Sequence, residues 1–240
     1  MSLLRSEWIK LFTTRTTWVM IGIGLLGEAL FAGLFVGLAS LNDVGGVDEI
    51  APGIGLILVL MLVLGVLLIT TEFRHGTSSS TFLASPRRYP VLAAKLALAL
   101  IVGVLVGLAF SVVNGGLALP LLDSRSGHLP ATGEIVRSYA GVVISLGLIC
   151  AFGLGVGAII RNQVGAIVAA IAFFFILSPL PELLPGQIGD YFPAQTIGSL
   201  QNNPQDHGLS QVAGGLVFAA WTFALCAIGT VLICKRDVVE

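Results

Sequence analysis

The sequence predicts an all-α integral membrane protein with six transmembrane helices in a single domain over residues 1–240. Its mean hydropathy is +0.99, and 56% of its residues are hydrophobic while only 10% are charged. Six apolar stretches also reach the roughly 20 residues that span a hydrocarbon core. They are residues 17–41, 50–71, 96–119, 139–160, 164–184 and 212–234.

The distribution of basic residues predicts the orientation of these spans. With a cytoplasmic N-terminus, six crossings place ten of the twelve lysines and arginines on the cytoplasmic side, as the positive-inside rule requires. Only Arg125 and Arg137 fall outside. Both termini are then cytoplasmic, and the first apolar run is too long for the core of a cleavable signal peptide.

Residues 2–15, before the first span, are expected to form an amphipathic helix. The apolar residues share one helical stripe and the polar residues take other faces: Leu4, Trp8, Leu11 and Phe12 against Arg5, Glu7, Lys10 and Thr14. A tryptophan beside basic residues is typical of the headgroup region, so this helix is predicted to lie in the membrane interface. Alternatively, it simply extends the first span.

Glycine pairs in three spans predict surfaces where helices approach closely. The pairs are Gly33 with Gly37, Gly103 with Gly107, and Gly153 with Gly157. Small residues at this spacing let backbones come together in lipid, although generic close packing explains each pair equally well. In the third span, the run Asn114-Gly115-Gly116 predicts a bend or an end of regular helix.

Glu28 lies about midway along the first span, where an ionisable side chain is costly. It is a candidate for the translocation path or for a dimer interface. Alternatively, it is a neutral carboxylic acid that forms hydrogen bonds with its neighbours. Asn114 is the nearest polar companion in another span.

Residues 178–210, before the last span, are predicted to form an external segment of short re-entrant or interfacial helices. Five prolines break any long helix there, and many apolar side chains lie between them. Such a segment needs protection by protein if it enters the membrane. Simple disorder is the alternative.

The sequence lacks the motifs of catalysis and of cofactor binding. It contains no GxxxxGK[ST] phosphate loop, no HExxH metal motif and no GxSxG elbow. Its three cysteines lack CxxC spacing, which favours a packing role. The chain is therefore expected to be no enzyme, to bind no cofactor or metal itself, and to bind no nucleic acid.

A short charged island, residues 72–90, separates the second and third spans. It begins with Glu72-Phe-Arg-His-Gly-Thr, continues with Leu83-Ala-Ser-Pro-Arg-Arg, and is followed by Lys95. A helix in this loop must stop at Ser85, because the residue before a proline is biased away from helix. The loop is predicted to bind a soluble partner, unless it is a basic loop that only fixes the topology.

These residues resemble the membrane subunit of a type-2 ABC exporter. The resemblance rests on the opening Glu7-Trp-Ile-Lys-Leu-Phe-Thr-Thr-Arg15, on the loop pattern Glu72-x3-Gly-Thr with Leu83-x2-Pro-x-Arg88, and on the six-span layout. It implies a connecting helix at residues 1–16, with Glu7, Trp8, Lys10 and Phe12. It also implies that the loop holds an ATPase-coupling helix over residues 74–85, with coupling residues Glu72, Arg74, His75, Gly76, Thr77, Phe82, Leu83, Pro86 and Arg88.

The function implied by this resemblance is that of a permease for efflux. A second copy or a related permease would complete the translocation path in the plasma membrane of a prokaryotic cell. A separate ABC ATPase subunit would bind ATP and Mg²⁺. A non-transporting immunity, sensor or anchor protein with the same fold is the alternative, and an intramembrane enzyme is disfavoured by the missing catalytic groups.

Overall fold

The computed structural model describes residues 2–38, 54–74, 76, 88–126, 129, 131–176, 186–201 and 209–235. These residues fold almost entirely into helices, and the described part of the chain contains no strand. The elements are α1 (Ser2–Thr13), α2 (Arg15–Leu38), α4 (Ile54–Arg74), α6 (Arg88–Ser126), α7 (Thr132–Ile160), α8 (Gln163–Ile176), the 3-10 helix η2 (Gly186–Tyr191), α9 (Pro193–Leu200) and α10 (Gln211–Lys235).

Five of the described helices are long and apolar enough to cross a membrane, namely α2, α4, α6, α7 and α10. The predicted fifth span corresponds to α8, an apolar helix of 14 residues. At 1.5 Å per residue α8 is about 21 Å long, which is shorter than a hydrocarbon core of about 30 Å. The prediction of an all-helical fold is thus confirmed for the described residues, and the five long apolar helices agree with a multi-pass membrane protein. The sixth span stays a prediction, because the residues after α8 lie outside the described ranges.

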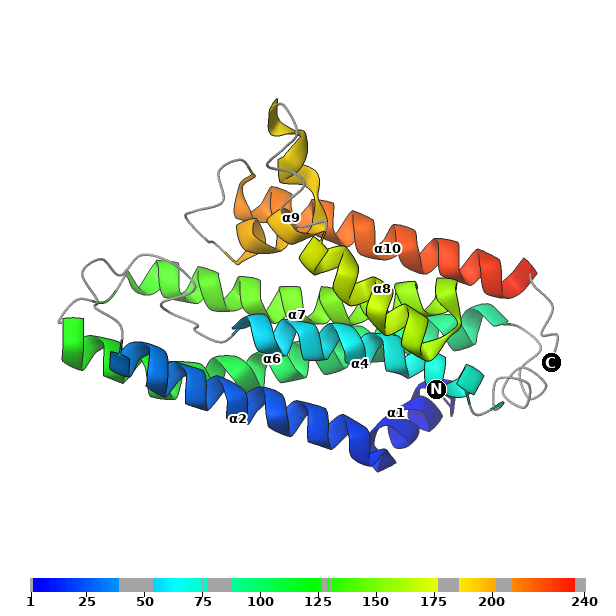
Figure 1. Ribbon diagram of the computed structural model, residues 1–240, viewed down its shortest axis with the longest axis horizontal. Coiled ribbons are helices and arrows are strands. Elements are labelled where there is room, and N and C mark those ends of the chain that lie inside the picture. The colour runs from blue at the N-terminus through cyan, green and yellow to red at the C-terminus, as the bar shows by residue number, and fades with distance from the viewer. Residues whose placement is uncertain are drawn as a thin grey trace.

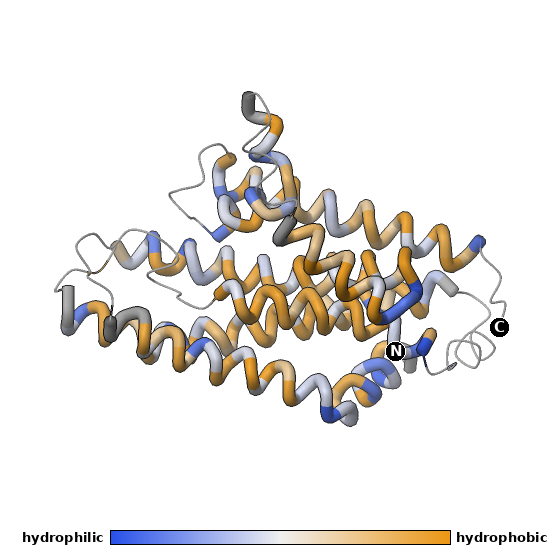
Figure 2. The backbone as a smooth tube through the Cα atoms, viewed as in Figure 1, coloured by the Kyte–Doolittle hydropathy of each residue, from blue (hydrophilic) through white to orange (hydrophobic). Residues whose placement is uncertain are grey.

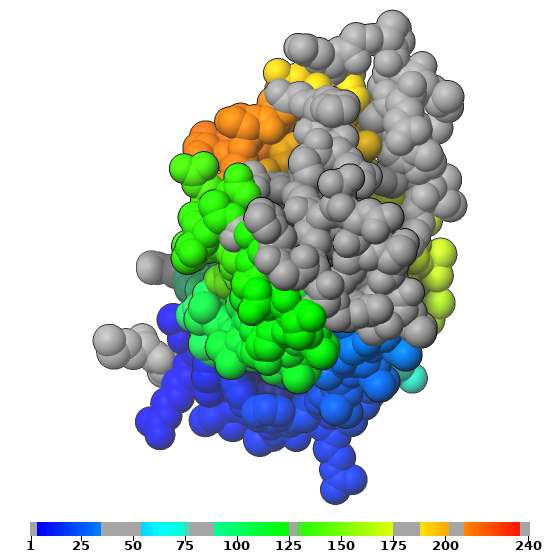
Figure 3. Space-filling model, turned by 90° about the vertical axis from the view of Figure 1, so that its left-hand side faces the viewer, coloured from blue at the N-terminus to red at the C-terminus, as the bar shows by residue number. Residues whose placement is uncertain are grey.

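The long helices run side by side along the long axis of the molecule (Figure 1). Viewed from one end, α2 and α10 lie on opposite sides of the bundle, with α6 and α7 between them (Figure 3). The hydropathy map shows apolar residues over most of the length of these helices (Figure 2). Helix α7 is the central element, because it packs against α4, α6, α8, α9 and α10.

The close packing of α7 depends on glycines whose missing side chain leaves room for a neighbouring backbone. A Cβ atom on Gly65 of α4 would overlap the carbonyl group of Cys150 in α7. In the other direction, a Cβ atom on Gly153 of α7 would overlap the carbonyl group of Leu62 in α4. Backbones held this close gain dispersion contacts, which drive helix association where there is no hydrophobic effect.

Two of the three predicted glycine surfaces are contact surfaces in the structure. Gly103 and Gly107 of α6 face the backbone of α7, and Gly157 of α7 faces α4. Gly33 of α2 has no described atom within 4 Å of a built Cβ, so it makes no close contact with the part of the chain that the structure describes. The expected contact at Gly33 is therefore not found there, and the surroundings of Gly37, near the end of α2, are not described.

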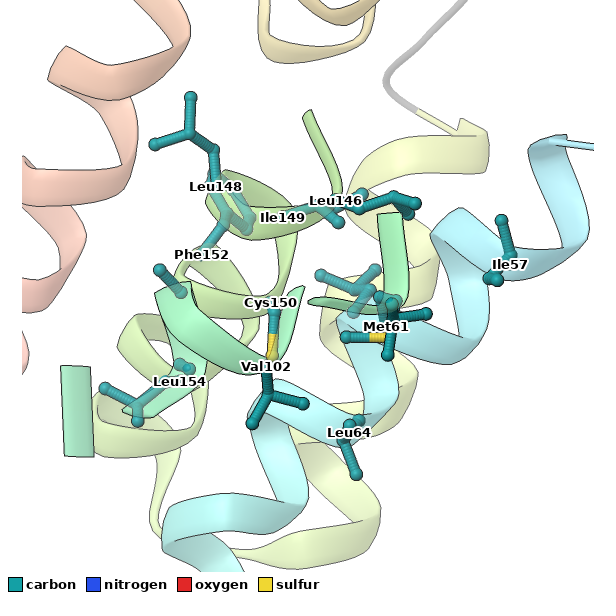
Figure 4. Packing of buried hydrophobic residues seen from close by; sticks show 14 of the residues in the cluster. Ile57, Met61, Leu64, Val102, Leu146, Leu148, Ile149, Cys150, Phe152 and Leu154 are labelled. Atoms are coloured by element: carbon teal, nitrogen blue, oxygen red, sulfur yellow. The ribbon is translucent and has the colours of Figure 1, made fainter. Parts of the chain in front are cut away.

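The hydrophobic core lies between α4, α6 and α7 (Figure 4). Cys150 of α7 is fully buried at its centre, close to Met61 of α4 and Val102 of α6 in the close-up view. Cys226 of α10 is also buried, and its thiol donates to the carbonyl oxygen of Ala151 at 3.3 Å. All three cysteines are free thiols, which agrees with a packing role.

Helix α6 is longer than predicted, and regular helix does not end at Asn114. It runs without interruption from Arg88 to Ser126 and includes Pro120. A glycine inside a helix costs only about 1 kcal/mol relative to alanine. In lipid, any break would leave backbone groups without hydrogen bonds, which costs more. The side chain of Asn114 is also held in place by neighbouring helices, as described below.

The segment before the last span forms short helices, as predicted. Pro193 occupies the first turn of α9, where its missing N–H is not needed. Helix α9 packs against α10 and α7, and the carbonyl group of Leu200 lies against Gly141 of α7. The indole of Trp221 in α10 donates to the carbonyl oxygen of Tyr191 at 2.9 Å. The re-entrant or interfacial placement of this segment stays a prediction, and residues 177–185 and 202–208 lie outside the described residues.

Candidate functional site

Most of the described lysines and arginines collect at one end of the bundle, where α1 lies and where α4, α7 and α10 end (Figure 1). They are Arg5, Lys10, Arg15, Arg74, Lys95, Arg161 and Lys235. This basic end is the one that the sequence predicts to be cytoplasmic. The structure places these residues together, and the side of the membrane that they face stays a prediction.

At the basic end, a charged cluster of Glu7, Lys10, Glu72 and Lys95 joins three helices. The ammonium group of Lys95 in α6 donates to Glu7 Oε2 of α1 at 2.6 Å and to Glu72 Oε1 of α4 at 2.8 Å. The ammonium group of Lys10 in α1 donates to Glu7 Oε1 at 2.7 Å and to Glu72 Oε1 at 3.1 Å. Each lysine therefore bridges both carboxylates.

The members of the charged cluster differ in burial. The side chain of Lys95 is 4% exposed, that of Glu7 6% and that of Glu72 13%, whereas that of Lys10 is 51% exposed. Removing charges from water is costly, and their mutual attraction compensates only when every charge has close partners. Two carboxylates matched by two ammonium groups meet that condition. The cluster thus fixes α1 to the ends of α4 and α6.

Electrostatic interactions within the cluster shift the pKa values of its α1 members. Burial raises the pKa of Glu7, but the nearby Lys95 and Lys10 outweigh it, so the net pKa lies below the ordinary 4.5. Burial lowers the pKa of Lys10, but its bonds to Glu7 and Glu72 outweigh it, so the net pKa lies above the ordinary 10.5. Both shifts favour the charged forms, as expected for ion pairs.

Acid is expected to release α1 from the bundle. The pKa of Glu7 is lowered on folding, so its contribution to stability is complete above its ordinary value of 4.5 and is lost as the pH falls through the lowered value. Because the pKa of Lys10 is raised, its contribution is lost only as the pH rises beyond 10.5. Amide hydrogen exchange of residues 2–13, corrected for intrinsic rates, should accelerate at about pH 3 relative to pH 7. Unchanged protection of α1 at low pH would contradict this.

Helix α1 turns a different face to the bundle than its sequence pattern suggests. Glu7 and Leu11 are buried, while Leu4 and Trp8 are exposed at 43% and 37%. The sequence pattern placed Glu7 on a face other than the apolar stripe, but the structure buries it, because its partner Lys95 lies in α6. The outer face carries an aromatic group, in which the Phe12 ring stacks on Trp8 with centroids 4.6 Å apart.

The structure describes both ends of the predicted coupling loop. Helix α4 ends at Arg74, whose guanidinium donates to Gln163 Oε1 of α8 at 3.2 Å. Gly76 follows with φ of 65°, a left-handed conformation that glycine adopts without strain. Helix α6 begins at Arg88. The other predicted coupling residues, His75, Thr77, Phe82, Leu83 and Pro86, lie outside the described residues.

A second polar group lies inside the bundle, away from the basic end. Glu28 of α2 is fully buried, and its Oε1 accepts a hydrogen bond from the side-chain amide of Asn114 in α6. The hydroxyl of Tyr139 in α7 donates to Asn114 Oδ1 at 2.6 Å. Glu28 Oε2 is buried and has no hydrogen-bond partner among the described residues. The sequence paired Glu28 with Asn114 correctly but did not identify Tyr139, because this residue lies at the edge of an apolar run without a distinguishing motif.

Substitutions at Glu28 are expected to separate its hydrogen bond from its charge. Glu28→Gln keeps an acceptor for the Asn114 amide, so its stability should stay close to that of the wild type. Glu28→Leu leaves that buried amide without its acceptor and should lose about 1–3 kcal/mol. Unfolding by SDS in mixed micelles measures the stability of both variants. A leucine variant that is more stable than the wild type would show that the cost of a carboxyl group at mid-membrane depth outweighs its hydrogen bond. For a charged group, this cost is about 2.5–3.5 kcal/mol.

In comparisons with known proteins, no family model matches this chain, and no curated protein matches it. The class that the fold and the site define is a multi-pass helical membrane protein with a buried charged cluster at its basic end.

Proposed function

We propose that this chain is the permease subunit of an ATP-driven exporter of the type-2 ABC class. In this proposal it forms the translocation path with a second copy or a related permease. ATP and Mg²⁺ bind to a separate ATPase subunit at the cytoplasmic side. The observation that carries the proposal is the charged cluster, because it links α1 to the two helices that flank residues 75–87.

The cluster provides a physical route from a bound partner to the membrane helices. Glu72 lies two residues before the end of α4, and Lys95 lies in the second turn of α6. A partner that moves the loop between these helices therefore moves both helix ends together. Glu7 extends the coupling to α1, and the close contacts of α4 and α6 with α7 extend it into the bundle. Such packed interfaces favour discrete alternative arrangements over continuous deformation.

The energy for such a change must come from the partner in this proposal. A nucleotide can shift the permease between two arrangements only if the ATPase binds them with different affinity in its ATP-bound and ATP-free states. Glu72, Arg74 and Gly76 lie at or just after the end of α4, next to the proposed ATPase-binding loop, so this difference in affinity would act on them. The non-transporting alternative needs a partner as well, but not a partner whose binding responds to nucleotide.

Purification of the full chain from the membranes of its own cells, in mild detergent, tests the proposal. An ATP-binding subunit should copurify in equimolar amount, with Mg²⁺-dependent, vanadate-sensitive hydrolysis. Glu72→Gln should weaken this association or change the hydrolysis rate, whereas Glu134→Gln, an exposed carboxylate in the first turn of α7, should not. Recovery of the chain without any ATP-binding subunit would favour the sensor or anchor alternative.

A further inference from the structure

A cavity of about 710 Å³ opens beside the charged cluster, between α1, the start of α2, α4 and α6. We call it the α1 cleft. Polar side chains surround one part of it, including Thr16 and Arg74, while leucines of α4 line another part, including Leu64, Leu67 and Leu68. The cleft is therefore amphipathic, with its polar and apolar groups separated along α4.

The aromatic residues of α1 and α2 indicate the depth of the cleft in the membrane. Trp8 and Trp18 are 37% and 52% exposed, and Phe12 packs against both rings. Exposed tryptophans collect at the membrane–water interface. Thr16 belongs to the same corner between α1 and α2, so the polar side of the cleft lies at headgroup level. At 1.5 Å per residue, the interval from Arg74 to Leu64 corresponds to about 15 Å of α4 directed into the hydrocarbon.

The charges around the α1 cleft favour an anion. The two carboxylates of the charged cluster are matched by its two lysines. Arg74 is the remaining charged residue among the described residues of the lining, so these residues together carry a net positive charge. The exposed guanidinium of Arg74 donates to Gln163 Oε1 at 3.2 Å, and its other N–H donors lie in the same planar fork, which suits phosphate oxygens. Thr16 lies in the first turn of α2, where the helix dipole adds a positive potential.

We propose that the α1 cleft binds one anionic phospholipid from the leaflet at the basic end. The phosphate contacts Arg74 and Thr16, and one acyl chain lies along Leu64, Leu67 and Leu68. The order of polar and apolar groups along α4 matches the order of headgroup and acyl chain in a lipid. This proposal does not depend on the proposed transport function, because it needs only the cleft and a membrane.

Native mass spectrometry of the purified full chain tests the proposal with phosphatidylglycerol, and with phosphatidylcholine of the same acyl chains as the zwitterionic control. The chain should retain one phosphatidylglycerol in preference to phosphatidylcholine. Arg74→Ala should weaken the binding of phosphatidylglycerol roughly fivefold, as expected for one basic residue near an anionic lipid. Arg137→Ala is the matched control, because Arg137 is exposed near the opposite end of α7.

Two further comparisons distinguish a lipid from a free phosphate and from general surface charge. Leu67→Trp places a larger side chain in the apolar part of the α1 cleft without changing any charge. It should also weaken the binding of phosphatidylglycerol. Inorganic phosphate should not compete. If Arg74→Ala unfolds the protein, Arg74→Lys serves instead and should show a smaller loss. Equal binding of the two lipids, competition by phosphate, or equal losses in the Arg74 and Arg137 variants would each overturn the proposal.

Discussion

Replacement of Lys95 by methionine is expected to destabilise the protein by about 3–5 kcal/mol, the usual cost of breaking a buried ion pair by removing one partner. The side chain of Lys95 is only 4% exposed and donates to both Glu7 and Glu72. Methionine fills a similar volume but leaves Glu7 Oε2 without its counter-charge. We therefore expect α1 to detach and the helix bundle to unfold at lower SDS mole fraction.

The matched control is Lys10→Met in the same cluster. The side chain of Lys10 is 51% exposed, so its ion pairs are screened by water and are worth about 0–1 kcal/mol. Glu7→Gln combined with Lys95→Met should recover part of the lost stability, because it removes the carboxylate that Lys95 had neutralised. Equal effects of the two lysine substitutions would show that burial of Lys95 does not determine the stability of the cluster.

Replacement of Gly153 by valine is expected to have the second large effect. Even a Cβ atom at this position would overlap the carbonyl group of Leu62, so α4 and α7 would have to separate. Overpacking in a rigid contact typically costs about 1–3 kcal/mol, and a backbone neighbour cannot move aside like a side chain. We expect the variant at or beyond the upper end of this range in SDS unfolding.

Gly116→Ala in α6 provides the control for Gly153→Val. No atom lies within 4 Å of a built Cβ at Gly116, and alanine is favoured over glycine inside a helix by roughly 0.5–1 kcal/mol. This variant should therefore unfold at the same or a slightly higher SDS mole fraction. A Gly153→Val protein as stable as the wild type would mean that α4 and α7 are not in the close contact described here.

The helices were predictable because each depends on local properties of the sequence. A long apolar run is sufficient to predict α4, and the carboxyl group of Glu28 inside another run is sufficient to predict a polar partner. These inferences need only hydropathy and the cost of burying a polar group.

The contacts that organise the structure depend on residues far apart in the chain. Lys95 is separated from Glu7 by 88 positions, and no periodicity predicts that pair. Gly65 belongs to none of the predicted glycine pairs, yet it has a backbone neighbour in α7. Burial of Glu7 was missed for the same reason, because helical pattern alone assigns a glutamate to the polar face. Tertiary partners, rather than local sequence, decide these positions.

Photo-crosslinking from the loop between α4 and α6 tests the central claim most directly, namely that a separate ATPase acts on this chain at its basic end. A photoreactive residue replaces Ser79 in the full chain in its own membranes, and Thr132, exposed at the start of α7, is the matched control position. We predict that a photoreactive residue in place of Ser79, and not one in place of Thr132, captures an ATP-binding subunit, and that the crosslinking yield changes with nucleotide. Lys95→Met should reduce this nucleotide-dependent change in yield. Capture of no ATP-binding subunit from Ser79, or equal capture from both positions, would contradict the account.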